Sequence, residues 1–303
     1  WTGILFGAPI LGVWYWCTDQ FIVHRVLSAK DIDNARRGSL FGGVLIILPL
    51  FIFVIPGIIA YAMAQNGELT VGEADQALPA LIGALLPAGL RGLVVAGLLA
   101  ALMSSLSSVF NSSSTLFTLD IYKKFRPDAS ERQLVWVGQI ATASLVVFGL
   151  LWIPIKRQMG DLFVYLQSVQ AYISPPIAAV FLLGIFFPRL NSRGAMAALA
   201  AGALIGMVRL VAEVNKEHLT GFLADFASIN FLHFAAMLFV LCSAILIIAS
   251  MTAPAPAASQ TDDITWKSGE EMATGDPAWR RVDVGISLFQ VGAVALVWMY
   301  FTG

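Results

Sequence analysis

The sequence predicts an all-α polytopic membrane protein, and three observations carry this prediction. Hydrophobic residues make up 58% of the 303 residues and charged residues only 12%, and the mean hydropathy is +0.80. Soluble domains carry about 25% charged residues, so a buried core alone does not account for this excess of apolar side chains. Several apolar runs also reach the about 20 residues that a helix needs to cross the hydrocarbon layer.

Eight apolar runs are predicted to cross the membrane, and the first of them is interrupted by polar residues. Residues 77–87 are interpreted as a short helix that lies at the interface. Residues 252–282 are charged and rich in Pro, Ala and Thr, which favours a polar linker. The predicted spans are 3–28, 40–64, 92–122, 133–154, 162–187, 194–213, 231–251 and 283–301.

The basic residues are unevenly distributed between the loops. If residue 1 lies outside, 13 of the 18 Lys and Arg residues fall on the cytoplasmic side and the other 5 on the outer side. Cytoplasmic loops carry such an excess of positive charge. We therefore expect a multi-pass protein of the plasma (cytoplasmic or inner) membrane, with the lipid bilayer as its surroundings.

Other functional classes find little support in the sequence. The net charge of −1 gives no indication of a nucleic-acid partner, and there is no metal-binding pattern, phosphate loop or nucleophile elbow that would indicate an enzyme with catalytic residues. Cys17 and Cys242 are expected to be small packing residues rather than a disulfide. His233 is expected in the core, and Arg209 and Glu213 are expected to form a surface ion pair, since they are four residues apart.

Residues 102–117, LMSSLSSVFNSSSTLF, gather hydroxyl groups inside an apolar run. Ala101 lies one helical turn before Ser104 and Ser105, and hydroxyl and carbonyl oxygens are the ligands that hard cations such as sodium prefer. The alternative is close helix packing, with each hydroxyl bonding back to the carbonyl four residues earlier. Both interpretations stay open, although the density of hydroxyls favours an ion path. The polar residues on one helix face are Ser104, Ser108, Asn111 and Thr115.

Residues 12–25, GVWYWCTDQFIVHR, change from apolar to polar within one predicted span. Asp19 would be costly on a lipid-facing helix, whereas irregular backbone is tolerated where it lines a cavity. The pattern therefore predicts a broken helix of the kind with which transporters expose backbone groups to a substrate. Tyr15 and Trp16 can stack on the apolar face of a sugar ring. The alternative is an aromatic belt, with Asp19 as the N-cap of a helix that begins at residue 21.

Residues 163–181, FVYLQSVQAYISPPIAAVF, place Gln167 and Gln170 on one helix face. Amides both donate and accept hydrogen bonds, which suits the hydroxyls of a sugar. Pro175 and Pro176 free backbone carbonyls and kink the span. The alternative is that the glutamines link neighbouring helices.

Three stretches together resemble the sodium/glucose cotransporter branch of the solute:sodium symporter family: WYWCTDQFIVHRVLSAKD (14–31), GLRGLVVAGLLAALMSSLSSVFNSSSTLFTLDIYKKF (89–125) and YLQSVQAYISPPIAAVFLLGIFFPRLNSRGA (165–195). The resemblance implies a leucine-transporter-type fold of two inverted five-helix repeats. The first repeat is expected upstream in the same polypeptide. The expected parts are the second repeat with its broken first helix (1–187), additional transmembrane helices (188–251), a polar cytoplasmic linker (252–282) and the last transmembrane helix (283–303).

The resemblance also implies roles for individual residues. Tyr15 matches the inner gate beneath the sugar, with Trp16 beside it, and Gln167 matches a ligand of a sugar hydroxyl. The residues implied for sodium are Ala101 (through its carbonyl), Ser104, Ser105 and Ser108, the last at a position linked to a second sodium in some members. The residues implied for the sugar are Tyr15, Trp16, Phe163, Gln167 and Gln170.

Three positions depart from the pattern of the family. Ile46 replaces a sugar-contacting lysine, Gly12 a small polar ligand and Gln170 a threonine. The expected function is sodium-coupled symport of a small neutral sugar, glucose- or galactose-like, into the cell. The departures leave open a sodium symporter of a polyol, a vitamin or an amino acid, and a membrane solute sensor that does not transport is a further alternative.

Overall fold

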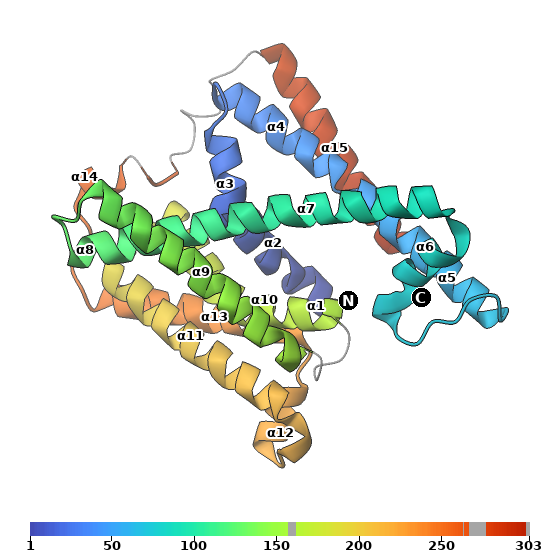
Figure 1. Cartoon of the computed structure of the whole chain (residues 1–303). Coiled ribbons are helices and arrows are strands. Elements are labelled where there is room, and N and C mark those ends of the chain that lie inside the picture. Colours follow the sequence, from blue (N-terminus) through green and yellow to red (C-terminus); the bar gives the residue numbers. More distant parts are fainter. Residues whose placement is uncertain (157–161, 263, 267–276, 301–303) are drawn as a thin grey trace. The chain divides into compact units, whose positions relative to one another are not determined.

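The computed structural model describes residues 1–156, 162–262, 264–266 and 277–300, and every regular element in these ranges is a helix (Figure 1). Seven described helices are long and apolar enough to cross a membrane, which confirms the prediction of an all-α polytopic protein. They cover Ile32–Gln65, Ala88–Phe125, Glu131–Pro154, Leu162–Phe186, Ser192–Val214, Phe231–Met251 and Arg281–Tyr300. The chain forms two compact units, which are described separately: Trp1–Val23 with Lys156–Thr274, and His24–Ile155 with Gly275–Gly303.

The predicted first span is divided into three short helices: α1 (Thr2–Phe6), α2 (Ala8–Thr18) and α3 (Gln20–Leu27). The break between α2 and α3 falls at Asp19, whose backbone is extended (φ −71°, ψ 118°). The Phe21 N–H donates to Asp19 Oδ1 at 2.9 Å, so this carboxylate satisfies one of the free donors at the start of α3. Asp19 therefore caps α3, as the alternative interpretation expected, and the helix is also broken at this residue, as the first interpretation expected.

The first unit is built around α10 (Leu162–Phe186), α11 (Ser192–Val214) and α13 (Phe231–Met251), with α2 packed against α10. Small residues recur every fourth position on α11. A Cβ at Gly194 would lie 2.5 Å from the Leu246 carbonyl oxygen, and a Cβ at Gly202 would lie 2.4 Å from Pro176 Cβ. Because these sites have no room for a side chain, the α11 backbone approaches α10 and α13 closely, as small residues allow between membrane helices. The small residues on this face are Gly194, Ala198, Gly202 and Gly206.

The chain after α13 returns to the end of α10. Arg189, in the turn between α10 and α11, donates to the Ser250 and Ala253 carbonyls at 3.1 Å each. The Trp266 N–H donates to the Ile185 carbonyl at 2.9 Å, so the beginning of the predicted linker is attached to α10. Residues 263 and 267–276 of that linker lie outside the described residues. The two short elements between α11 and α13 are η4 (Lys216–His218) and α12 (Phe222–Ser228), and α14 (Ala258–Thr261) follows α13.

The first complete helix of the second unit is α4 (Ile32–Leu45), which Asp31 caps through a 2.7 Å hydrogen bond from the Asn34 N–H. That bond holds the pKa of the Asp31 carboxyl below its usual value. A π-helical turn follows Pro49, which lacks an N–H, and continues into α5. The later elements are η1 (Leu50–Val54), α5 (Ile55–Gln65), η2 (Ala74–Gln76), α6 (Ala77–Leu85), α7 (Ala88–Thr115), η3 (Leu116–Tyr122), α8 (Lys123–Phe125), α9 (Glu131–Lys156) and α15 (Pro277–Tyr300).

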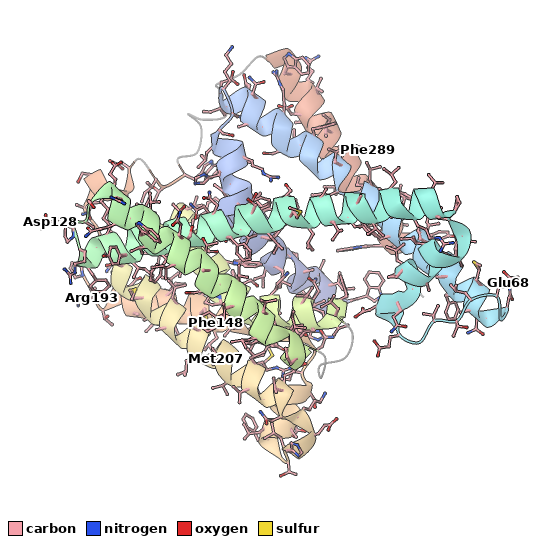
Figure 2. The ribbon with its side chains drawn as sticks, in the orientation of Figure 1. Glu68, Asp128, Phe148, Arg193, Met207 and Phe289 are labelled. Carbon is pink, nitrogen blue, oxygen red and sulfur yellow. The ribbon has the colours of Figure 1, made fainter. Side chains whose placement is uncertain are left out.

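The last helix, α15, packs against α4 within this unit. Gln290 Nε2 donates to the Leu40 carbonyl at 2.6 Å, and the Arg37 guanidinium lies 4.1 Å from the centre of the Trp279 ring. The remaining helix surfaces carry large apolar side chains that are exposed, such as Phe148 and Phe289 (Figure 2). Such surfaces are typical of helices that face lipid.

Two predictions about single residues are wrong. Arg209 and Glu213 do form an ion pair, but Arg209 is only 2% exposed, so the pair is not on the surface. His233 is exposed rather than packed in the core, and its Nε2 lies 2.8 Å from Thr2 Oγ1. Both cysteines are free; Cys242 is buried as predicted, whereas Cys17 is exposed.

We expect Gly202→Ala to lower the apparent melting temperature of the purified protein in detergent by several degrees, because overpacking a tight contact costs about 1–3 kcal/mol. The matched control is Gly184→Ala on α10, where an added Cβ would meet nothing within 4 Å. Equal melting temperatures for the two variants would contradict the close approach of α11 to α10 and α13.

Candidate functional site

The five residues predicted for the sugar all lie in the first unit, on the two helices α2 and α10 that pack together. Tyr15 and Trp16 are in the last turn of α2, directly before the break at Asp19. Their rings are 5.1 Å apart and nearly perpendicular, and both are exposed. Two aromatic faces are therefore available beside the point at which the helix is interrupted.

The other predicted sugar residues lie in the first half of α10. Phe163 is 71% exposed, and Gln167 and Gln170 are half-buried. Pro175 and Pro176 follow, and because proline has no N–H they leave two carbonyls of the preceding turn without their helical partners. The helix nevertheless continues to Phe186, and most of its residues between Ala171 and Ala179 are buried. The amides thus precede a firmly packed segment and remain accessible to a solute.

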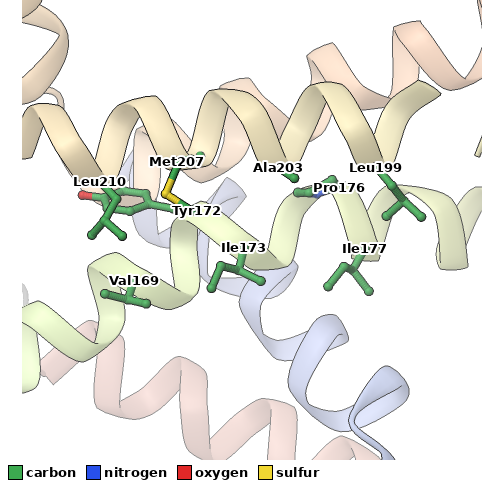
Figure 3. Close-up of a pocket in the computed structure, with 10 residues that line it drawn as sticks. Val169, Tyr172, Ile173, Pro176, Ile177, Leu199, Ala203, Met207 and Leu210 are labelled. Carbon is green, nitrogen blue, oxygen red and sulfur yellow. The ribbon is translucent and has the colours of Figure 1, made fainter. Parts of the chain in front are cut away.

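A cavity of about 320 Å³ lies between α10 and α11 (Figure 3). Its walls are apolar apart from Tyr172, and neither Gln167 nor Gln170 lines it. A site for a sugar needs several hydrogen-bonding groups, so this cavity is not suited to one. The residues that form its α10 wall are Val169, Tyr172, Ile173, Pro176 and Ile177.

The residues predicted for sodium lie on α7, in the second unit. Ala101, Ser104 and Ser105 are exposed, and Ser108 is half-buried. The Ser108 hydroxyl donates to the Ser104 carbonyl at 3.0 Å, which is the back-bonding pattern of the alternative interpretation. Within the described residues, no hydrogen bond of the Ser104 or Ser105 hydroxyl is found.

These α7 oxygens make only part of a coordination shell. Ala101, Ser104 and Ser105 offer one carbonyl and two hydroxyl oxygens, whereas a hard cation takes about six. Among the described residues there is no cluster of three or more His, Cys, Asp or Glu side chains that could hold a metal ion.

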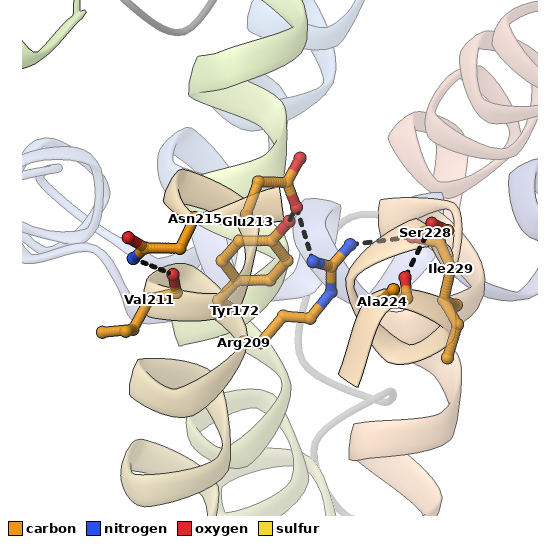
Figure 4. Close-up of polar contacts among 8 residues, drawn as sticks. All are labelled: Tyr172, Arg209, Val211, Glu213, Asn215, Ala224, Ser228 and Ile229. Carbon is orange, nitrogen blue, oxygen red and sulfur yellow. Dashed lines mark hydrogen bonds and ion pairs between the residues drawn. The ribbon is translucent and has the colours of Figure 1, made fainter. Parts of the chain in front are cut away.

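The sequence reasoning missed a buried polar group beside α10 (Figure 4). We call it the Arg209 cluster, and it consists of Arg209 and Glu213 of α11, Tyr172 of α10 and the Ile229 carbonyl. Arg209 Nη1 lies 2.7 Å from Glu213 Oε2, and Nη2 donates to the Ile229 carbonyl at 2.9 Å. The Tyr172 hydroxyl donates to the same Glu213 oxygen at 2.5 Å. The spacing of the charged pair was visible in the sequence, but its burial and its tyrosine partner were not.

Comparison with known proteins identifies the family. The model of the sodium:solute symporter family matches residues 1–202. The chain is 41% identical to the sodium/mannose cotransporter SLC5A10 of Bos taurus over 93% of this chain and 53% of the relative. It is 39% identical to the sodium/myo-inositol cotransporter 2 of Mus musculus (96% and 46%) and 41% identical to the sodium/glucose cotransporter 4 of Homo sapiens (88% and 42%).

All three relatives are named as cotransporters rather than enzymes. The chain spans about half the length of these relatives. The family match covers α2, α7 and α10, the helices that carry the candidate residues. The chain therefore belongs to the sodium:solute symporter family.

Proposed function

We propose that this chain takes part in sodium-coupled symport of a small, hydroxyl-rich solute, a sugar or a polyol, across the plasma membrane. The observation that carries the proposal is the position of the amides and aromatic rings on two helices that pack together, in a chain about 40% identical to sodium cotransporters named for mannose, myo-inositol and glucose. The full-length protein supplies the remaining part of each site.

On the solute side, Gln167 and Gln170 bind hydroxyl groups, because an amide can donate to one oxygen and accept from another. Trp16 offers an apolar face to the C–H face of a ring, and Tyr15 closes the path below the solute. The break at Asp19 allows the chain to bend directly after Tyr15 and Trp16, because extended backbone there interrupts the helical hydrogen bonds.

On the sodium side, the Ala101 carbonyl and the Ser104 and Ser105 hydroxyls act as ligands. Ser108 is the weaker candidate, since its hydroxyl already donates to the Ser104 carbonyl. Coupling requires that sodium and solute each bind one conformation better than the others. Moving one charge through 100 mV supplies roughly 2.3 kcal/mol, so inward transport gains from an inside-negative potential.

The three departures from the family pattern lead us to propose a class of solute rather than one compound. Ile46 and Gly12 remove polar ligands, whereas Gln170 adds a longer amide that can reach a hydroxyl further from the helix. The solutes in the names of the relatives also differ, and they share a ring with several hydroxyl groups. We therefore propose the class of neutral sugars and cyclic polyols rather than one sugar.

The symport proposal predicts that a sodium gradient drives uptake of labelled mannose, glucose or myo-inositol into proteoliposomes containing the full-length protein. An inside-negative potential should increase the initial rate, because net positive charge enters with the solute. The measurement compares uptake in sodium with uptake in potassium. Equal uptake of all three solutes in the two salts would exclude sodium-coupled transport of this class.

Ser105→Ala should raise the sodium concentration for half-maximal uptake about tenfold, because a hydrogen bond or ligand bond to a charged group contributes roughly 1.5–3 kcal/mol. Ser144→Ala on α9 is the matched control, since the Ser144 hydroxyl bonds back to the Ile140 carbonyl as in an ordinary packed helix. If the sodium dependence of Ser105→Ala equals that of the control, the serines of α7 serve packing alone.

Gln167→Ala should raise the KM for the transported solute about tenfold while uptake still depends on sodium, since one polar contact to the solute is lost. Gln139→Ala on α9 is the control, because Gln139 is exposed and lies in the other unit. An unchanged KM in Gln167→Ala would remove this amide from the solute site.

A further inference from the structure

The Arg209 cluster places a positively charged side chain, that of Arg209, inside the apolar part of the first unit. The Arg209 guanidinium lies 5.1 Å from the ring centre of Tyr172, 5.6 Å from that of Phe234 and 5.8 Å from that of Phe226. Its side chain is 2% exposed, whereas that of Glu213 is 30% exposed. The positive charge is therefore enclosed by one carboxylate, one carbonyl and three aromatic faces.

Stability alone gives little reason for such a group. Removing two charges from water costs several kcal/mol per ion, and well-packed apolar residues often replace a buried ion pair without loss of stability. Charged residues within membrane segments are costly, and they usually serve a function. What the cluster provides instead is a fixed relative position of its members, because a planar guanidinium fixes the positions of the acceptors that it binds.

This fixed geometry has its main effect at Tyr172, whose position is held by three contacts. Its hydroxyl donates to Glu213, its ring packs edge-on against Phe234 at 5.3 Å, and its carbonyl oxygen would lie 2.3 Å from a Cβ at Gly206. Pro176 has no N–H to give that carbonyl its usual helical partner. The contact with the Gly206 backbone therefore supports α10 at the turn where its own hydrogen bonding is weakest.

Tyr172 also lies close to the proposed solute ligands along α10. Gln170 precedes it by two residues and Gln167 by five, which correspond to about 3 Å and 7.5 Å along a helix axis. From Ala171 to Ala179 most residues of the helix are buried. In the turns before this segment, Phe163 and Leu166 are exposed, and Gln167 and Gln170 are half-buried. Tyr172 is thus the point at which the rigid part of α10 meets the part that carries the amides.

We infer that the Arg209 cluster is a positioning device for the solute site, which fixes α10 at Tyr172 and thereby sets where Gln167 and Gln170 meet the solute. This inference rests on the proposed function, in which those amides bind the solute. None of the three side chains contacts the solute; they act through the backbone of α10.

The test is Tyr172→Phe in the full-length protein in proteoliposomes, which removes one hydroxyl and keeps the ring. We expect the KM for the solute to rise about tenfold, with the sodium concentration for half-maximal uptake within twofold of wild type at saturating solute. The matched control is Tyr61→Phe on α5, where the tyrosine is 67% exposed and lies in the other unit. KM is the informative quantity, because a loss of folded protein lowers Vmax and leaves KM unchanged.

Arg209→Lys is the second variant. It keeps the charge but loses the planar guanidinium group, whose two terminal nitrogens contact Glu213 and the Ile229 carbonyl at the same time. Like Tyr172→Phe, it should raise the KM for the solute. A KM within twofold of wild type in both variants would overturn the positioning role, and failure of Tyr172→Phe to fold would assign the hydroxyl to stability instead. Wild-type protein without sodium-driven uptake would refute the proposed function itself, which is a different result.

Discussion

The close approach of α11 to α10 and α13 is the constraint on which the first unit depends. Gly202 and Gly206 leave no space for a side chain opposite Pro176 and the Tyr172 carbonyl, so backbones meet there rather than side chains. Lipid tails are as apolar as leucine, and association within the membrane therefore relies on such close packing and on polar contacts. The Arg209 cluster supplies polar contacts at the same interface. Together they make the middle of α10, from Ala171 to Ala179, a fixed support for the turns that precede it.

This support explains how a helix with two consecutive prolines can carry a binding site. Prolines weaken α10 at the turn before them, and the lost helical bonds would let the amides move. Packing against α2, α11 and α13 limits that movement on three sides. The proposed solute ligands Gln167 and Gln170 thus lie next to a stiff segment, whereas the break at Asp19 places a bend next to Tyr15 and Trp16. A transporter needs both, because recognition requires fixed ligands and alternating access requires a part that bends.

The length and composition of the apolar runs were sufficient to predict the seven long helices, and the polar residues of 12–25 predicted where the first span breaks. Burial was harder to predict, because in a membrane protein an apolar face can meet either lipid or protein. For that reason His233 was expected inside and is exposed, whereas Arg209 was expected on the surface and is enclosed. The serines of α7 show the same ambiguity. The Ser108 hydroxyl bonds back to its own helix, whereas among the described residues no such bond of Ser104 or Ser105 is found. Three-dimensional neighbours, rather than spacing along the chain, decide such cases.

We propose that sodium bound by α7 and a hydroxyl-rich solute bound by α2 and α10 favour the same conformation. Coupling of this kind is reciprocal, so it appears in binding at equilibrium without any transport. The most direct test is equilibrium binding of labelled solute to the purified full-length protein, titrated in sodium and in potassium at equal ionic strength. We expect tighter binding of solute in sodium, with a matching gain in sodium affinity when solute is present. Identical affinities in the two salts would contradict it.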